Sequence, residues 1–209
     1  MLVIFVFSYD REEMLSEVVK PLGRHFLILD DGSSFEFENM VKFPHEGKAG
    51  FWKRWAFAFK TAEATNDDLF IFMPDDFQHL QVDKIKQLHE LHKHEPYAYN
   101  IINDGRLSCW FPFTPKKYNE DTIQVGFVDC GFFCNRESLE KLEFRIDPID
   151  PKRFKTRKNI SSGVGQQLTN RFNRHGVKMH LPVKSLAYHG DHDSKMHYEF
   201  RKNNPLISK

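Results

Sequence analysis

Residues 69–76 read Leu69-Phe70-Ile71-Phe72-Met73-Pro74-Asp75-Asp76, five apolar side chains followed by a proline and two acids. An uninterrupted apolar run of this length, preceded by Asp67-Asp68, is typical of a strand buried on both faces of a parallel sheet. The two carboxylates then lie together at the carboxyl end of that strand. Open α/β sheets bind their ligands at this edge.

The same pattern of strand, helix and polar turn occurs upstream. Residues 2–8 predict a first buried strand, and apolar side chains at helical spacing predict a helix over 11–19. Residues 25–29 predict a second strand, which runs into the polar turn Asp30-Asp31-Gly32-Ser33-Ser34. A helix is expected over 50–64, although the pattern leaves open whether Arg54 on it faces the core or a ligand.

The alternation continues downstream. We expect a helix over 82–92, then irregular chain, a strand over 125–134, and helices over 136–142 and 163–175. Strands that alternate with helices predict an α/β fold, with a Rossmann-type, mostly parallel sheet, helices on both faces and one antiparallel addition. We expect residues 1–209 to form one domain.

Composition narrows the class of protein. The chain has 209 residues, 40% apolar and 28% charged, with a net charge of +1, which argues against a globally basic nucleic-acid binder. No apolar run approaches the roughly 18 residues that span a bilayer, so we expect a soluble protein without a membrane span. The first residues resemble a strand rather than a signal peptide, which favours the cytoplasm. Cys109, Cys130 and Cys134 lack metal-ligand spacing.

One segment is locally basic. It contains, within residues 151–158, the cations Lys152, Arg153, Lys155, Arg157 and Lys158. Such a run is either a solvated loop and helix face or a contact surface for a polyanion such as DNA.

The acidic pair has two interpretations. Asp75 and Asp76 repel each other unless a cation holds them, and Mg²⁺ or Mn²⁺ selects such oxygen ligands and bridges them to substrate phosphates. The alternative is a pair of acids at the start of a helix, where Asp is favoured for hydrogen bonding and charge.

Three segments in this order, residues 7–11, 29–34 and 72–76, resemble the nucleotide-sugar site of family 2 and related GT-A glycosyltransferases. The resemblance implies a GT-A fold. In such a fold residues 1–80 would bind the donor, and residues 81–209 would bind the acceptor and close the site.

Individual roles follow from the same resemblance. It implies that Ser8 and Tyr9 line the nucleotide pocket, that Asp31 meets the base or ribose, and that Asp75 contacts ribose or metal. Asp76 matches the last, metal-binding acid of a D-x-D-like motif. Pro74 stands where a strict D-x-D motif has its first acid.

Two further positions match donor-site features of the family. His189-Gly190 resembles a late His-Gly segment that closes over the diphosphate, in which the histidine completes the metal shell and the glycine lets the backbone approach phosphate. Lys48 lies where a basic residue often stands near the donor and could balance phosphate charge. The histidine could equally be a surface or core residue, and the lysine a solvated loop residue.

The catalytic base is the weakest match. Residues 161–168, where many inverting members carry an acid, contain none. Asp129 is the preferred substitute, ahead of Asp147 and Asp150, because it follows an apolar run. It could also be a turn acid or a buried, hydrogen-bonded one.

These features together predict a metal-dependent glycosyltransferase that uses Mn²⁺ or Mg²⁺ and a nucleotide-sugar donor, with UDP as the expected nucleotide. The acceptor would be a saccharide or, given the basic segment, a hydroxymethylated base in DNA, which would have to be flipped from the duplex. A non-catalytic nucleic-acid-binding protein and a nucleotidyltransferase remain the alternatives.

Overall fold

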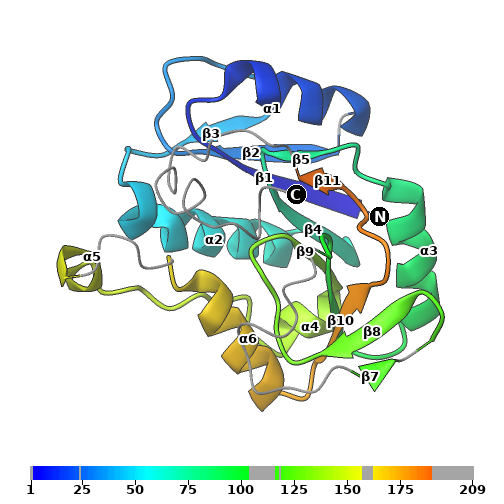
Figure 1. Ribbon diagram of the computed structural model, residues 1–209. Helices are drawn as coiled ribbons and strands as arrows, with labels where there is room; N and C mark the ends of the chain where they lie inside the picture. Colours follow the sequence, from blue (N-terminus) through cyan, green and yellow to red (C-terminus); the bar gives the residue numbers. More distant parts are fainter. Residues whose placement is uncertain (1, 24, 104–115, 118, 157–161, 190–209) are drawn as a thin grey trace, which may run out of the picture.

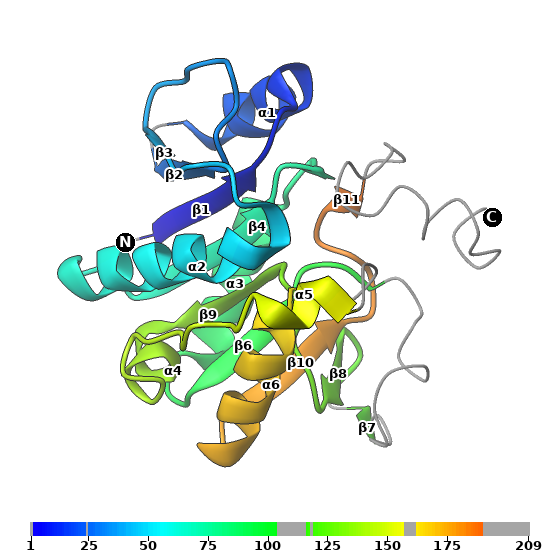
Figure 2. The same cartoon turned by 90° about the vertical axis from the view of Figure 1, so that its left-hand side faces the viewer.

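The computed structural model describes residues 2–23, 25–103, 116–117, 119–156 and 162–189. Within them one large sheet has the strand order β3-β2-β1-β4-β9-β6-β10-β8-β7, and β11 and β5 form a separate pair. The helices cover both faces of the large sheet (Figures 1 and 2).

The first strands form the parallel half of this sheet. Its strands are β1 (Leu2–Ser8), β2 (Phe26–Asp30), β3 (Met40–Lys42) and β4 (Leu69–Pro74). β1 lies between β2 and β4 and pairs in parallel with both. The expected α/β architecture is confirmed here, because helices connect β1 to β2 and β3 to β4, while residues 31–39 connect β2 to β3 without a helix.

The second half of the sheet is mixed. It contains β6 (Tyr97–Asn100), β7 (Lys116–Lys117), β8 (Thr122–Val125), β9 (Phe132–Asn135) and β10 (Lys178–Pro182). β9 is inserted antiparallel between β4 and β6, whereas β6 and β10 are parallel. β8 pairs antiparallel with β10 and β7. The sheet is therefore mostly parallel, with β9 and β8 running against the other strands.

The helices are α1 (Glu12–Val19), α2 (Gly47–Ala64), α3 (Val82–His92), α4 (Arg136–Glu140), α5 (Lys152–Thr156) and α6 (Val164–Arg174), with a 3-10 turn at Lys20–Leu22. Five of these helices lie where apolar periodicity predicts them, whereas α5 was not predicted as a separate helix. α2 and α6 lie on one face of the sheet, and α1 and α3 lie on the other (Figure 1).

Alternation along β1 and β4 explains the two layers. Phe5 and Phe72 pack with α2 and α6, and their rings stack on each other at 5.2 Å. Their neighbours Val6 and Ile71 point the other way and pack with α1 and α3. Because successive strand residues face opposite sides, an unbroken apolar run is required to fill both cores.

The prediction of one strand over 125–134 is wrong. β8 ends at Val125 and β9 begins at Phe132, and residues 126–131 form a loop between them. Side chains from elsewhere hold this loop: the backbone N–H of Val128 donates to Thr169 Oγ1 at 3.0 Å, and that of Asp129 donates to Asn100 Oδ1 at 2.8 Å. The loop runs along the edge at which β1 and β4 end.

No helix in the described part of the chain is long and apolar enough to cross a membrane.

Candidate functional site

The acidic pair lies at the carboxyl end of β4, beside the end of β1. Phe7 and Pro74 are register partners, and the backbone N–H of Asp75 donates to the carbonyl of Phe7 at 3.0 Å. The chain then forms β5 (Phe77–Gln78), and α3 starts only at Val82. Asp75 and Asp76 are therefore not helix caps.

Asp75 is buried, and both of its oxygens have donors. Oδ2 accepts from Ser8 Oγ at 3.0 Å and from the backbone N–H of Tyr9 at 3.3 Å. Oδ1 accepts from Arg11 Nη1 at 3.0 Å. Burial raises the pKa of Asp75 to about 6, although the Arg11 cation opposes this shift.

Asp76 has a different environment. Its Oδ2 lies 3.3 Å from Arg11 Nη1 and 3.6 Å from His189 Nε2. The residue is only 5% exposed, and no donor among the described residues reaches Oδ1. A buried carboxylate oxygen without a donor is costly, so this atom is suited to a ligand that supplies positive charge.

β11 (Tyr188–His189) brings the histidine to this edge. It pairs antiparallel with β5, with His189 opposite Phe77, and the two rings meet edge to face at 5.6 Å. Figure 2 shows β11 beyond the ends of β1 and β4. Gly131 packs against Phe77, where a Cβ would come within 2.3 Å of the ring. The predicted approach of His189 to Asp76 is thus present.

Asp31 follows β2 but is almost wholly enclosed by protein. It is 1% exposed and accepts from the backbone N–H groups of Glu46 and Gly47 at 3.3 and 3.0 Å. His45 Nδ1 lies 3.1 Å from Asp31 Oδ2. This carboxylate therefore satisfies two of the free amides at the start of α2, and the helix begins three residues before the predicted Gly50.

Two rings form a short stack above Asp31. Tyr9 and His45 lie face to face with centroids 4.4 Å apart, and about half of the His45 side chain remains exposed. The stack gives a flat, partly open surface beside the acidic pair. Lys48 lies nearby on the first turn of α2, where burial lowers its pKa.

Arg54 faces the interior beneath this edge. It is 2% exposed, donates to the carbonyl of Ser8 at 3.2 Å, and lies 3.7 Å from Asp31 Oδ2. Burial lowers its pKa, while Asp31 and other nearby acids raise it. Arg54 is therefore a buried counter-charge for the strand ends rather than a residue open to solvent.

The buried charges at this edge do not cancel. Two guanidinium groups, on Arg11 and Arg54, face four buried carboxylates, namely those of Asp30, Asp31, Asp75 and Asp76. A surplus of negative charge in a site of low solvent access favours binding of a cation.

A divalent cation fits only part of this set. Asp76 Oδ1 and the His189 imidazole are suitable ligands, whereas both Asp75 oxygens are engaged. No cluster of three or more metal-ligating side chains occurs in the described ranges. Mg²⁺ and Mn²⁺ commonly take one or two protein ligands and complete their shell with water and substrate phosphates, so two ligands are sufficient here.

Asp129 lies at the same edge and is exposed. Its Oδ1 accepts from the backbone N–H of Cys130 at 2.7 Å, which fixes the carboxylate beside the loop. Asp147 and Asp150 are held elsewhere: Asp147 pairs with Arg145, and Asp150 accepts from the backbone of Lys152. Asp129 is thus the acid of these three that stands on the loop touching Phe77.

Gly190, Arg157 and Lys158 lie outside the described residues, and nothing is described of the side chain of Lys155. Lys152 is exposed on α5, and the Arg153 guanidinium lies 5.6 Å from the Phe154 ring centroid.

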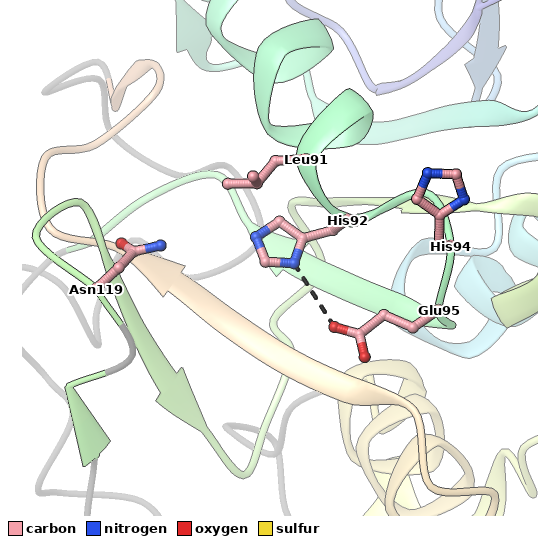
Figure 3. Close-up of a pocket in the computed structure, with 5 residues that line it drawn as sticks. All are labelled: Leu91, His92, His94, Glu95 and Asn119. Carbon is pink, nitrogen blue, oxygen red and sulfur yellow. Dashed lines mark ion pairs between the residues drawn. The ribbon is translucent and has the colours of Figure 1, made fainter.

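A separate hollow of about 270 Å³ shares no residue with these strand ends. It is lined by Leu91, His92, His94, Glu95 and Asn119 (Figure 3). His92 Nδ1 lies 3.7 Å from Glu95 Oε1, while burial lowers the pKa of His92. The hollow adds nothing to the acidic site.

Solved structures identify the architecture. Staphylococcus aureus TarS, residues 1–349, superposes with a TM-score of 0.61 and 11% identity, over 90% of this chain and 59% of that one. The chain has a GT-A fold. It spans less than two thirds of that TarS fragment.

Two other structures agree with the GT-A fold. Glucosyl-3-phosphoglycerate synthase from Mycobacterium tuberculosis, in complex with Mn²⁺ and UDP-glucose, has a TM-score of 0.53 and 13% identity, over 92% of this chain and 72% of that one. A197 from STIV has a TM-score of 0.52 and 16% identity, over 91% and 86%. No protein-family model matches the GT-A chain, and no curated protein matches its sequence.

Sequence reasoning missed two site residues of this GT-A chain and left a third open. Arg11 lies within the motif of residues 7–11, but that motif predicts no role for it, and the sequence around His45 does not mark it as a site residue. The helical pattern leaves open whether Arg54 faces the core or a ligand. An arginine two residues after a strand-end tyrosine, opposite two acids, is a signal that could have suggested the first.

Proposed function

We propose that the protein is a glycosyltransferase that moves a sugar from a nucleotide-diphosphate donor, expected to be a UDP-sugar, to an acceptor hydroxyl group. The observation that carries this proposal is the buried Asp76 carboxylate, whose Oδ1 has no donor in the described chain and whose Oδ2 faces His189. It stands at the ligand-binding edge of a GT-A fold.

In this proposal Asp76 and His189 hold Mn²⁺ or Mg²⁺. A divalent ion held by these residues would supply positive charge beside the diphosphate leaving group. The crystal structure of the M. tuberculosis synthase, which contains Mn²⁺ and UDP-glucose, supports this assignment by likeness of fold.

The donor would lie over the ends of β1 and β2. Tyr9 would border the nucleotide. Ser8, which is 2% exposed and donates to Asp75, would support the pocket from beneath. Asp31 would act on the nucleotide through the His45 ring that it orients. Lys48 and the backbone of Gly190 would meet phosphate oxygens. We assign residues 1–80 to the donor and 81–209 to the acceptor and to closure of the site.

Asp129 is the proposed base. Its carboxylate would take the proton of the acceptor hydroxyl while the acceptor oxygen bonds to the anomeric carbon and the bond from that carbon to the diphosphate oxygen breaks. The electron pair of the broken bond leaves with the nucleoside diphosphate. The exposure of Asp129 at this edge supports its role as the base, since the acceptor must reach the carboxylate from solvent.

The acceptor would be a saccharide or a hydroxymethylated base in DNA. Lys152 and Arg153 on α5, with the other cations of the basic segment, would contact the phosphates of DNA. A cytoplasmic location belongs to the same proposal and is supported by the free thiols of Cys130 and Cys134.

The decisive test is nucleotide binding by thermal shift, with UDP, GDP, CDP and ADP, each with and without Mn²⁺. Selective ligands stabilise the native state by mass action. We expect a Mn²⁺-dependent shift with UDP. Asp76→Ala should weaken this binding by at least about tenfold, because it removes the carboxylate that holds the ion.

The matched control is Asp83→Ala, which removes an exposed acid on α3 and should bind UDP normally. No shift with any nucleotide would refute the transferase. Release of pyrophosphate rather than a nucleoside diphosphate would indicate a nucleotidyltransferase. DNA binding that ignores both metal and nucleotide would indicate a non-catalytic nucleic-acid-binding protein.

A further inference from the structure

We propose that Arg11 is a resident cation of the acidic pair, which keeps Asp75 out of the metal shell and leaves one weak cation site at Asp76 and His189. The use of that site rests on the proposed function. The ion-binding behaviour does not, because it concerns the protein alone.

The contact geometry supports a bridging role. A single nitrogen, Arg11 Nη1, lies 3.0 Å from Asp75 Oδ1 and 3.3 Å from Asp76 Oδ2. All three side chains are largely shielded from solvent, at 11%, 6% and 7% exposure. A cation shared between two carboxylates would occupy the same position, and here a guanidinium nitrogen fills it.

Asp75 is fully committed while Arg11 stays in place. Its second oxygen accepts from Ser8 Oγ and from the backbone N–H of Tyr9. Only one Asp76 oxygen, Oδ2, contacts a donor, because Oδ1 has none among the described residues. One carboxylate of the pair is therefore structural, and the other is available to an ion.

Charge reinforces this division. A guanidinium beside Asp76 repels any divalent ion that binds there, in a site with little solvent to screen the repulsion. Loss of Arg11 would remove that repulsion and also free Asp75 Oδ1 as a ligand. Both effects act in the same direction, towards tighter binding of a metal ion.

The experiment measures binding of Mn²⁺ alone, without nucleotide, to the full chain by titration calorimetry. Arg11→Gln should bind Mn²⁺ at least about tenfold more tightly than the wild type, because a charge is removed and a ligand is gained. Arg11→Lys keeps the charge and should stay within about threefold of the wild type. Equal or weaker binding by Arg11→Gln would overturn the proposal.

A double variant tests the route through Asp75. Arg11→Gln combined with Asp75→Asn removes the freed carboxylate, so its Mn²⁺ affinity should fall back by most of the gain. If the double variant binds as tightly as Arg11→Gln, Asp75 is not the ligand and the proposal fails.

Folding of the single variant is checked by circular dichroism. If Arg11→Gln does not fold, the proposal is tested instead by the Mn²⁺ affinity of the single variant Asp75→Asn. It should bind Mn²⁺ within about threefold of the wild type, since Asp75 is not a ligand while Arg11 is present. A loss larger than about tenfold would overturn the proposal.

The two proposals fail separately. If the wild type binds no nucleoside diphosphate but the variants show the Mn²⁺ affinities expected above, the transferase proposal is refuted and the role of Arg11 is supported. If the wild type binds UDP with Mn²⁺ but Arg11→Gln has no higher affinity for Mn²⁺, only the proposed role of Arg11 is refuted.

Discussion

Two strand ends with similar sequences have different tasks in this molecule. β2 and β4 both finish in a pair of acids at the same edge. Asp31 at the first end is taken up by backbone amides of α2, whereas Asp76 at the second keeps one oxygen without a donor in the described chain. The residue type is the same, and only the partners supplied by distant segments distinguish a structural carboxylate from one available to a ligand.

The largest expected effect is on the structural side of this comparison. Asp31→Ala should lower the free energy of unfolding by about 3 to 5 kcal/mol, because it leaves the buried Arg54 without its nearest acid and two amides of α2 without an acceptor. Urea denaturation measures it. Asp31→Asn keeps an acceptor oxygen and should lose less. A loss below about 1 kcal/mol for the alanine variant would mean that Asp31 is not structural.

A smaller effect concerns the pH dependence of the second strand end. The pKa of Asp75 is raised to about 6, mainly by burial, so the folded state holds this proton more tightly than the unfolded state does. Stability from this group is complete below about pH 4 and is lost as the pH rises through 6, by about 3 kcal/mol in total.

Asp75→Asn should remove this component. Denaturation between pH 4 and 7, in EDTA, should show the wild type losing stability relative to the variant as the pH rises. Parallel profiles would contradict the raised pKa.

The smallest effect is at the ring stack beside Asp31. His45→Ala removes a stacked partner of Tyr9 and should cost about 0.5 to 1 kcal/mol. Thermal or urea denaturation resolves a change of this size. The control is His94→Ala, at an exposed position, which should change the free energy of unfolding by close to zero. If both variants lose equally, the stack contributes nothing to stability.

Local patterns were sufficient for the first part of the fold. The strands at 2–8 and 69–74 and the helices at 12–19 and 82–92 match their predictions because each apolar pattern is complete within the segment. The turn of the chain at 126–131 was not visible, because Thr169 and Asn100 hold it from outside the segment.

The same limit applies to other elements. β6 lies within a stretch expected to be irregular, since four residues after a proline carry too little periodicity to be recognised. α2 starts earlier than predicted because its cap comes from Asp31, far away in the sequence.

The candidate site divides in a similar way. The resemblance predicts roles for the acids at 75 and 76 and for the histidine at 189, and the structure brings Asp76 and His189 together. The partners of Asp75 were not found, because nothing local shows that Arg11 crosses from the start of α1 to β4. The catalytic role of Asp129 stays a prediction.

The pairing of β11 with β5 also sets an order of assembly during synthesis. β1, α1 and β4 leave the ribosome before β11 does, so Arg11 can meet Asp75 and Asp76 before His189 is made. His189 emerges much later and reaches Asp76 only when β11 docks beside Phe77. A nascent chain would therefore hold its two acids beside Arg11 first, and the proposed cation site would be complete only after β11 has docked.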